Sequence, residues 1–534
     1  MTEKRRTIGL MSLIFSAVLM QVGSAWLFGV GLTAKIAGPA AIFTWIIGAI
    51  VMSFIALTIA EVAPCFPKMG GLGRYLKYSH GDLSAFLGDW AGFLALIFSV
   101  IVEAVSIVQY ASSWPFAWAK LLYNTTTSSL TFHGLIFASF IVIILFIVNA
   151  LSLKVLMHSI KGLGIFKVFV IICAVAIPII YLGHLSFSNF VSYHKSFVPY
   201  GWSSVWTAIA VGGVIPAFVG FQAPVSFAGE AKNPGRNIPL AIILAMVISM
   251  VIYTCLQFTF LYAFPLNSIG GNWQNLSLQS PFVDLTTLLG LHFLTLLLFS
   301  DALLAPTTTG IILMGAAPRT LYGLHSTKHI PRFLGKISRK TYIPLNALIF
   351  SLVLSVGILW LVPSWEKVIS ILTLCYMINF LAGPAAAIGL RKNAKDLVRT
   401  VKIPCMPVIS FISFLVIAFL LLACGWPRTA YMSFALLAGF AIYLYYEYKV
   451  KKFVGFSAEI KSSIWLIVFM PFVSLFDYLA SDKLGGIGIF SAYSPAHIIC
   501  FVAGISIIFY LMLKFSRRTE ALEQVILAQV KEQR

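Results

Sequence analysis

Three small residues, Gly23, Ser24 and Ala25, stand in the middle of an apolar segment that runs from about Ile8 to Ala34. Glycine and serine are poor helix formers, so we expect a membrane-crossing helix to be interrupted here, near its midpoint. Backbone freed from helical bonding at that depth persists only where protein or a wet cavity satisfies it. The amides at this break would begin a half-helix, whose positive end favours a carboxylate.

A second interruption lies further along the chain, where Pro216 removes a backbone donor inside another glycine-containing apolar run. The carbonyls of Ala217, Phe218 and Val219 would end a half-helix there, and its negative end favours an ammonium group. The Phe218 ring is interpreted either as an aromatic gate over a ligand or as ordinary packing. Two interrupted spans five helices apart predict an inverted repeat with a ligand site near the midplane; a simple kink at each place is the alternative.

Three ionisable residues fall deep within apolar spans, where an ion is costly enough to be a functional candidate. Glu103 and Asp301 either carry a proton or belong to fixed structure, paired with Lys167 or bonded to a backbone amide. Lys167 is either a buried functional cation or a lysine that reaches back to the cytoplasmic face. The sequence leaves these alternatives open.

The composition of the 534-residue chain is that of a polytopic membrane protein, because 60% of its residues are hydrophobic and only 10% are charged. The net charge of +20 does not indicate a nucleic-acid partner, since 30 of the 37 Lys and Arg fall in loops on one side of the predicted spans and five on the other. The positive-inside rule therefore predicts that both termini lie in the cytoplasm. The expected location is the inner or plasma membrane of the cell. The lipid bilayer is the expected large partner, and nothing in the sequence indicates an oligomeric state.

The apolar runs predict an all-α fold of about fourteen spans, at about 8–34, 40–64, 83–118, 134–152, 163–183, 203–229, 239–264, 286–317, 344–362, 366–390, 407–425, 429–448, 462–480 and 496–514. We group them into a first repeat (1–200), a second repeat (201–395), accessory spans (396–515) and a cytoplasmic tail (516–534).

Several stretches, in this order and spacing, resemble the amino acid, polyamine and organocation (APC) superfamily of permeases over about the first 400 residues. They are Gly23-Ser24-Ala25 with Phe28, Glu61-Val62-Ala63-Pro64, Pro67 to Gly71 with Tyr75, Phe218-Val219-Gly220-Phe221, Gly229 to Pro234, and Arg319 to Tyr322 before Ile330-Pro331. Within the superfamily the chain is most similar to bacterial aspartate:proton symporters, through the runs Gly23 to Phe28 and Tyr75 to Gly81. The usual Gly-Ser-Gly is Gly-Ser-Ala in this chain, and the bulky Trp26 follows it, which would alter the pocket.

The resemblance implies a leucine-transporter-type fold of 5+5 inverted repeats with about four additional C-terminal transmembrane helices. It also implies that Lys167 takes the place of a metal cation, its ammonium bridging the broken first span and the hydroxyls of Thr307, Thr308 and Thr309. The coupling ion would then be a proton rather than sodium, and no cofactor is expected.

Three further polar residues within spans either line the ligand pocket or form helix–helix hydrogen bonds, namely Gln109, Tyr110 and Asn379. Two carboxylates at cytoplasmic span ends, Glu61 and Glu230, either form an inner gate with Arg74 or Lys232 or are solvated end charges.

The expected function is secondary active import of an amino acid, aspartate or another small one, by proton symport with alternating access. An exchanger of amino acids or polyamines, a nutrient sensor that no longer transports and a membrane-embedded enzyme are the alternatives. The nine histidines show neither a metal-ligand cluster nor a nucleophile elbow, which argues against the enzyme. Aspartate as the substrate rests on the resemblance alone, because Lys167 is the only deep cation that the sequence offers to an acidic side chain.

Overall fold

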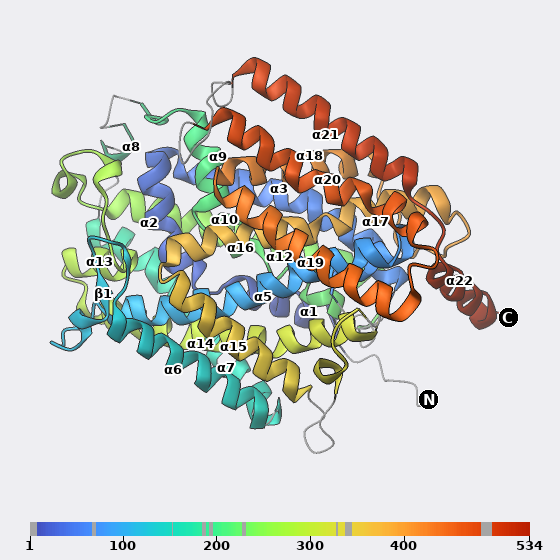
Figure 1. Cartoon of the computed structure of the whole chain (residues 1–534). Coiled ribbons are helices and arrows are strands. Elements are labelled where there is room, and N and C mark those ends of the chain that lie inside the picture. Colours follow the sequence, from blue (N-terminus) through green and yellow to red (C-terminus); the bar gives the residue numbers. More distant parts are fainter. Residues whose placement is uncertain are drawn as a thin grey trace.

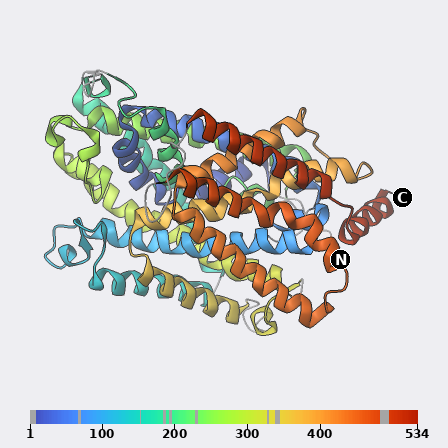
Figure 2. The ribbon, with the colours of Figure 1, turned by 45° about the horizontal axis from the view of Figure 1, so that its top comes forward.

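The computed structural model describes residues 8–66, 71–151, 153–183, 188–191, 196–226, 231–326, 329–336, 344–481 and 494–533. Long helices run along an elongated bundle (Figure 1). One end of the bundle carries the short hairpin of β1 (Tyr123–Asn124) and β2 (Ser129–Leu130), and is called the outer end below. The C-terminal helix projects from the other end, called the inner end (Figures 1 and 2).

The helices of the first half of the chain are α1 (Leu10–Gln21), α2 (Ala25–Ala37), α3 (Ala41–Val62), α4 (Arg74–Ser79), α5 (Asp82–Ala111), α6 (Phe132–Leu151), α7 (Leu153–Leu182), α8 (Ser188–Val191), α9 (Trp202–Val211), α10 (Val214–Phe218), α11 (Ala223–Ser226) and α12 (Pro234–Ala263). Those of the second half are α13 (Pro281–Leu288), α14 (His292–Ser326), α15 (Leu345–Leu361), α16 (Trp365–Phe380), α17 (Ala382–Asn393), α18 (Met406–Cys424), α19 (Arg428–Lys451), α20 (Phe456–Ala480), α21 (Pro495–Phe515) and α22 (Glu520–Gln533).

Short 3-10 turns occupy Gly38–Ala40, Ala63–Cys65, Ala119–Leu121, Leu266–Ile269, Trp273–Asn275 and Arg332–Gly335.

Eleven helices in the described ranges are long and apolar enough to cross a membrane, or up to twelve if one sharply bent pair counts as a span. The all-helical, polytopic fold is thereby confirmed. Each of the fourteen predicted ranges overlaps at least one helix, but α1 and α15 are shorter than a full span, so the number fourteen and the 5+5 repeat remain predictions. The predicted span at 286–317 begins too early, because the chain turns at Gly290 (φ +71°) between α13 and α14.

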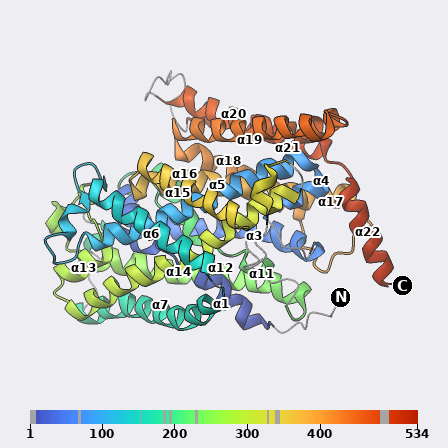
Figure 3. The same ribbon diagram turned by 60° about the horizontal axis from the view of Figure 1, so that its bottom comes forward.

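The helices pack in layers around α3, α5 and α16, whose side chains are largely buried. The accessory helices α19, α20 and α21 form a layer on one side of the molecule, while α1, α7 and α14 lie toward the opposite side (Figure 3). α5 packs extensively against α14 and α16. It is therefore the central helix, and the site lies beside it.

The first predicted break is present between α1 and α2. Helical bonding stops at Val22, whose backbone turns to φ −80° and ψ 77°, and α2 begins at Ala25. The Gly23 amide closes this turn, because it bonds back to the Gln21 carbonyl at 2.9 Å instead of continuing the helix.

The second predicted break separates α9 from α10, and the axes of the two flanking helical pieces differ by 59°. Gly213 takes a left-handed conformation there, and the chain leaves α10 at Val219 in an extended conformation. Gly220 follows with φ +127°, and a Cβ on it would lie only 2.7 Å from the Gln21 amide nitrogen. The two broken segments therefore meet where one of them must be glycine.

Candidate functional site

A cavity of about 50 Å³ lies between the two breaks. Both broken segments, α5, α14 and α16 contribute to its wall. Its polar and backbone-exposing lining residues are Gln21, Gly23, Ser24, Ala25, Ser99, Glu103, Pro216, Val219, Thr309 and Tyr376. The predicted carboxylate-binding residues Gly23, Ser24 and Ala25 all face this cavity.

The Glu103 carboxylate of α5 lies directly against the first break. A Cβ added to Gly23 would be 2.8 Å from Glu103 Oε1, and the carboxylate also interacts with Ser24. Glu103 is 6% exposed, and its Oε2 has no hydrogen-bond partner among the described residues. An ionisable oxygen of the protein thus faces the amides that sequence reasoning assigned to a ligand carboxylate.

Lys167 of α7 is buried and donates a hydrogen bond to the Val22 carbonyl, at the residue where α1 stops. The expected contact with the backbone of the broken first span is therefore present. The ammonium also interacts electrostatically with Glu103 and with Asp301 of α14. Asp301 is fully buried, and neither of its carboxylate oxygens has a hydrogen-bond partner in the described part of the chain.

The predicted threonine contacts with Lys167 are not seen. Thr307 donates its hydroxyl to the Leu303 carbonyl at 2.6 Å, and Thr308 donates within the same helix. Thr309, which also bonds to its own helix, is the threonine that lines the cavity. Neighbouring residues on a helix point about 100° apart, so only one of three consecutive side chains reaches a given cavity.

The second broken segment is tied to the first. Phe218 O accepts a hydrogen bond from Gln21 Nε2 at 3.1 Å, and the Tyr253 hydroxyl lies 3.0 Å from both Ala217 O and Gln21 O. Each carbonyl oxygen has two lone pairs, so these bonds leave one acceptor position on Ala217 O and one on Phe218 O, whereas Gln21 O also accepts the Gly23 amide. Of the three residues whose carbonyls were predicted to accept hydrogen bonds from an ammonium group, only Val219 lines the cavity.

Phe218 is not positioned as a gate over the cavity. Its ring is fully buried, 5.3 Å from the Tyr253 ring and 6.3 Å from the Trp45 ring, and it does not line the cavity. This position agrees with the packing interpretation of Phe218 rather than with a gate. The ring belongs to the contact between α10, α3 and α12.

Three predicted pocket residues also lie elsewhere. Asn379 donates to the Gly88 carbonyl at 2.8 Å, which is the helix–helix alternative, and Tyr110 donates to Leu27 O at 2.8 Å. Gln109 lines a different cavity, nearer the outer end.

Sequence reasoning missed Tyr376, whose hydroxyl lies 3.0 Å from the Ser99 hydroxyl inside the central cavity. The spacing offers one signal, because Ser99 and Glu103 are four residues apart and so share a helix face. It offers none for Tyr376, whose direction depends on how α16 packs on α5.

An aromatic layer separates the central cavity from the outer end. The Phe28 and Trp365 rings stack at 4.7 Å, and the Tyr110 ring meets Phe28 edge-on at 4.9 Å. Phe28 and Trp365 line the outer cavity, whereas Ala25 and Ile369, one turn away on the same helices, line the central one. This layer closes the site from the outside.

At the inner end Glu61 forms a bidentate ion pair with Arg391 of α17, with both nitrogen–oxygen distances at 2.7 Å. The same carboxylate accepts the Ile403 amide at 2.8 Å. Neither alternative from the sequence describes Glu61, because Arg74 donates to the Phe66 carbonyl and the Glu61 side chain is only 2% exposed. Glu230, the other predicted gate residue, lies outside the described residues.

A profile described as amino acid permease matches residues 8–434. The chain belongs to the amino acid permease family. This membership confirms the resemblance to the APC superfamily and makes the chain a multi-pass membrane transporter rather than an enzyme. Its substrate class is amino acids.

Individual permeases are similar over nearly the whole length. The glutamate/serine transporter AimA of Bacillus subtilis is 36% identical over 98% of this chain and 96% of its own. The aspartate-proton symporter of the same organism is 32% identical over 95% of this chain and 96% of its own. A branched-chain amino acid permease, BcaP of B. subtilis, is 26% identical over 84% of this permease and 94% of its own chain.

Proposed function

We propose that this permease imports an amino acid together with a proton, by alternating access around the central cavity. The observation that carries the proposal is the position of Glu103 against Gly23. The amides freed at this break are suited to a substrate carboxylate, yet a carboxylate of the protein already faces them.

Two ionised carboxylates at this break would repel each other. At a separation of about 4 Å and an effective dielectric constant of about 20, the repulsion between two unit charges is about 4 kcal/mol. A protonated Glu103 is neutral and removes that repulsion. Substrate and proton therefore favour each other's binding, which is the thermodynamic requirement for symport.

Lys167 supplies a fixed positive charge where a metal cation could otherwise act. Its ammonium holds the Val22 carbonyl at the end of α1, and it balances one of the two buried carboxylates, Glu103 and Asp301. With both carboxylates ionised the group would carry one uncompensated negative charge in a low-dielectric site, which favours taking up a proton. This charge balance supports coupling to protons rather than sodium and requires no cofactor.

Alternating access is supported by closures on both sides of the cavity. The layer of Phe28, Trp365 and Tyr110 lies on the outer side, and the Glu61–Arg391 ion pair lies at the inner end. We propose that these open in turn while the breaks stay at the midplane. The excess of Lys and Arg on one side of the spans supports a cytoplasmic position for the inner end and both termini.

The substrate is proposed to be aspartate, glutamate or a small hydroxylated amino acid. The names of two relatives support this range, one being a glutamate/serine transporter and the other an aspartate-proton symporter.

The test is uptake of labelled aspartate, glutamate and serine into liposomes that contain the purified permease. An imposed inward proton gradient should drive accumulation, and an uncoupler should abolish it. Accumulation that follows a sodium gradient and ignores the uncoupler would contradict proton coupling. Counterflow that is fast without any gradient, together with no net accumulation, would identify an exchanger instead.

A further inference from the structure

A larger cavity, of about 330 Å³, opens at the outer end. Its volume falls in the usual range for small-molecule sites. The charged residues in its wall are Lys35 of α2, Glu366 of α16 and Arg428 of α19. Lys35 and Glu366 also line the smaller cavity that lies against the aromatic layer, so the two spaces adjoin.

The three charged side chains of this wall form no ion pair with one another or with other described residues. Neither Lys35 nor Glu366 makes an ion pair or a side-chain hydrogen bond with a described residue. Arg428 donates one hydrogen bond to the Cys424 carbonyl, at 2.8 Å, and it interacts electrostatically with Asp477. Among the described residues the Cys424 carbonyl is the one hydrogen-bond acceptor of Arg428, so the other guanidinium N–H groups can reach a ligand.

We propose that this outer cavity is a binding site for an acidic amino acid on its way to the central cavity. Lys35 and Arg428 face its two carboxylates, and Glu366 faces its ammonium group. The assignment rests on charge complementarity, since the wall carries two cations and one anion and a dicarboxylic amino acid carries two anions and one cation. A neutral amino acid such as serine leaves one of the two cations without a partner.

The outer site accounts for an otherwise missing feature of an acidic-substrate permease. None of the described residues that line the central cavity is a lysine or arginine. The nearby buried ammonium of Lys167 is already engaged by Val22, Glu103 and Asp301. Selection for the second carboxylate must then occur elsewhere on the path.

The outer site is also connected to the closure beneath it. Glu366 directly follows Trp365, and Lys35 lies seven residues, or about two turns, beyond Phe28 on the same face of α2. Trp365 and Phe28 are the stacked rings of the aromatic layer. A substrate held between Lys35 and Glu366 therefore contacts both helices that must separate to admit it.

The inference rests on the proposed function and is tested by uptake kinetics in liposomes. Lys35→Gln and Arg428→Gln should each raise the KM for glutamate and aspartate about fivefold, as expected for the loss of one partly exposed ion pair. The KM for serine should stay within about twofold of the unaltered permease. Lys35→Arg should restore the affinity for the acidic substrates.

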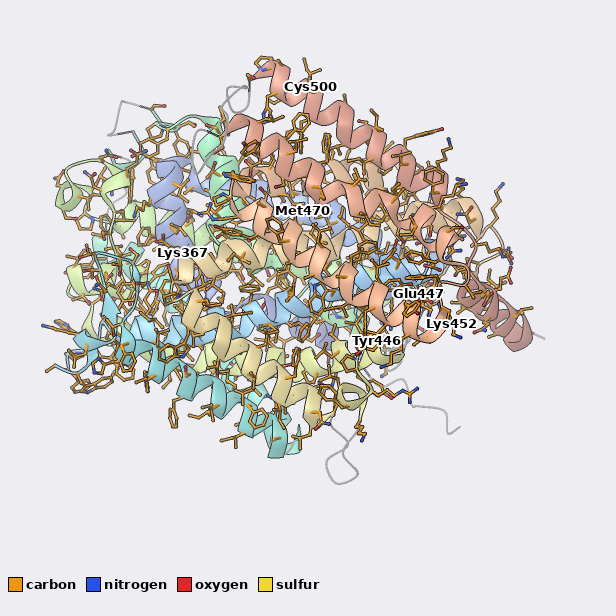
Figure 4. All side chains as sticks on the ribbon, viewed as in Figure 1. Lys367, Tyr446, Glu447, Lys452, Met470 and Cys500 are labelled. Carbon is orange, nitrogen blue, oxygen red and sulfur yellow. The ribbon has the colours of Figure 1, made fainter. Side chains whose placement is uncertain are left out.

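Lys367→Gln is the matched control. Lys367 is exposed at the same end of the bundle, opposite Glu447 and Lys452, and lines neither outer cavity (Figure 4). The Lys367→Gln substitution removes the same charge from the same end of the bundle, so a general effect of surface potential would appear in this variant too. Equal effects of Lys35→Gln and Lys367→Gln, or equal effects on serine and glutamate, would overturn the proposal.

A binding measurement separates the two ways of failing. Glutamate should raise the melting temperature of the unaltered permease and of Lys367→Gln more than that of Lys35→Gln/Arg428→Gln, because ligand binding stabilises the folded state. If this difference appears but no amino acid is taken up, the proposed function fails and the outer site stands. If uptake is normal and the difference is absent, the outer site fails alone.

Discussion

Lys167 donates a hydrogen bond to the backbone carbonyl of Val22, the residue at which the first broken span stops being helical. The two residues are 145 positions apart in sequence, and their contact joins α7 to the end of α1. A side-chain cation therefore holds the break whose amides we propose as the substrate-binding groups.

Lys167→Met is expected to abolish accumulation driven by a proton gradient. The change leaves the Val22 carbonyl without its donor and Glu103 and Asp301 without a cation, and a lost hydrogen bond to a charged group costs about 1.5–3 kcal/mol. We expect at least a tenfold drop in accumulated substrate in liposomes. Lys120→Met, which removes an exposed lysine near the outer end, is the control. Full accumulation by Lys167→Met would show that this contact is dispensable.

Gly23→Ala is expected to weaken substrate binding at least tenfold. The added Cβ would lie 2.8 Å from Glu103 Oε1, so the Glu103 carboxylate would have to move away from Gly23. Gly9→Ala in the same N-terminal segment adds the same methyl group with nothing within 4 Å, and should leave binding unchanged. Unaltered affinity in Gly23→Ala, measured by thermal shift with titrated substrate, would mean that substrate does not use this break.

The Glu61–Arg391 pair should couple in a double-mutant cycle. Glu61 is 2% exposed, so Arg391→Gln leaves a buried carboxylate without its partner, at a cost below the 3–5 kcal/mol of a fully buried pair because Arg391 is 29% exposed. Glu61→Gln/Arg391→Gln should be less destabilised than the sum of the single variants. We also expect faster substrate efflux from preloaded liposomes, since the inner closure is loosened.

The exposed pair of Arg518 and Asp396 is the control for that cycle, because surface ion pairs contribute little. Arg518→Gln should change neither the melting temperature nor the efflux rate measurably. If the destabilisations of the Glu61 and Arg391 single variants simply added in the double variant, the proposed closure by this ion pair would be contradicted.

Stability at the inner end should depend on pH through His80, which lies between α4 and α5. Burial lowers the pKa of His80 from its usual 6.5 to about 4. The unfolded chain therefore binds the proton more readily, so this contribution is complete above pH 6.5 and is lost as the pH falls toward 4. Its size is on the order of 3 kcal/mol.

His80→Gln should flatten the fall of the melting temperature between pH 6.5 and pH 4. The exposed His133 provides the comparison, and His133→Gln should keep the slope of the unaltered permease. An unchanged slope in His80→Gln would show that His80 is not buried as described.

The two breaks could be predicted from the sequence because their cause is local. Glycine, serine and proline inside apolar runs disfavour continuous helix wherever they occur, and α1 indeed ends two residues before Gly23. The depth of Glu103, Lys167 and Asp301 was predictable for the same reason, since a charge within an apolar run is visible without knowing its neighbours.

The direction of individual side chains could not be predicted. Whether Thr308 or Thr309 reaches the cavity, and whether Phe218 faces Tyr253 or a ligand, depends on how helices distant in sequence rotate against one another. The partner of Glu61 was missed because Arg391 comes 330 residues later, while Arg74 is close in sequence. The outer cavity was missed for the same reason, since its three charges come from α2, α16 and α19.

Proton movement during uptake tests the central claim most directly. Liposomes carrying a trapped pH indicator, with no imposed gradient, would report protons entering with added substrate. We expect the unaltered permease to acidify the lumen as substrate enters, and Glu103→Gln to exchange labelled for unlabelled substrate without acidification. Substrate-dependent acidification that persists in Glu103→Gln would contradict the claim that this carboxylate carries the coupled proton.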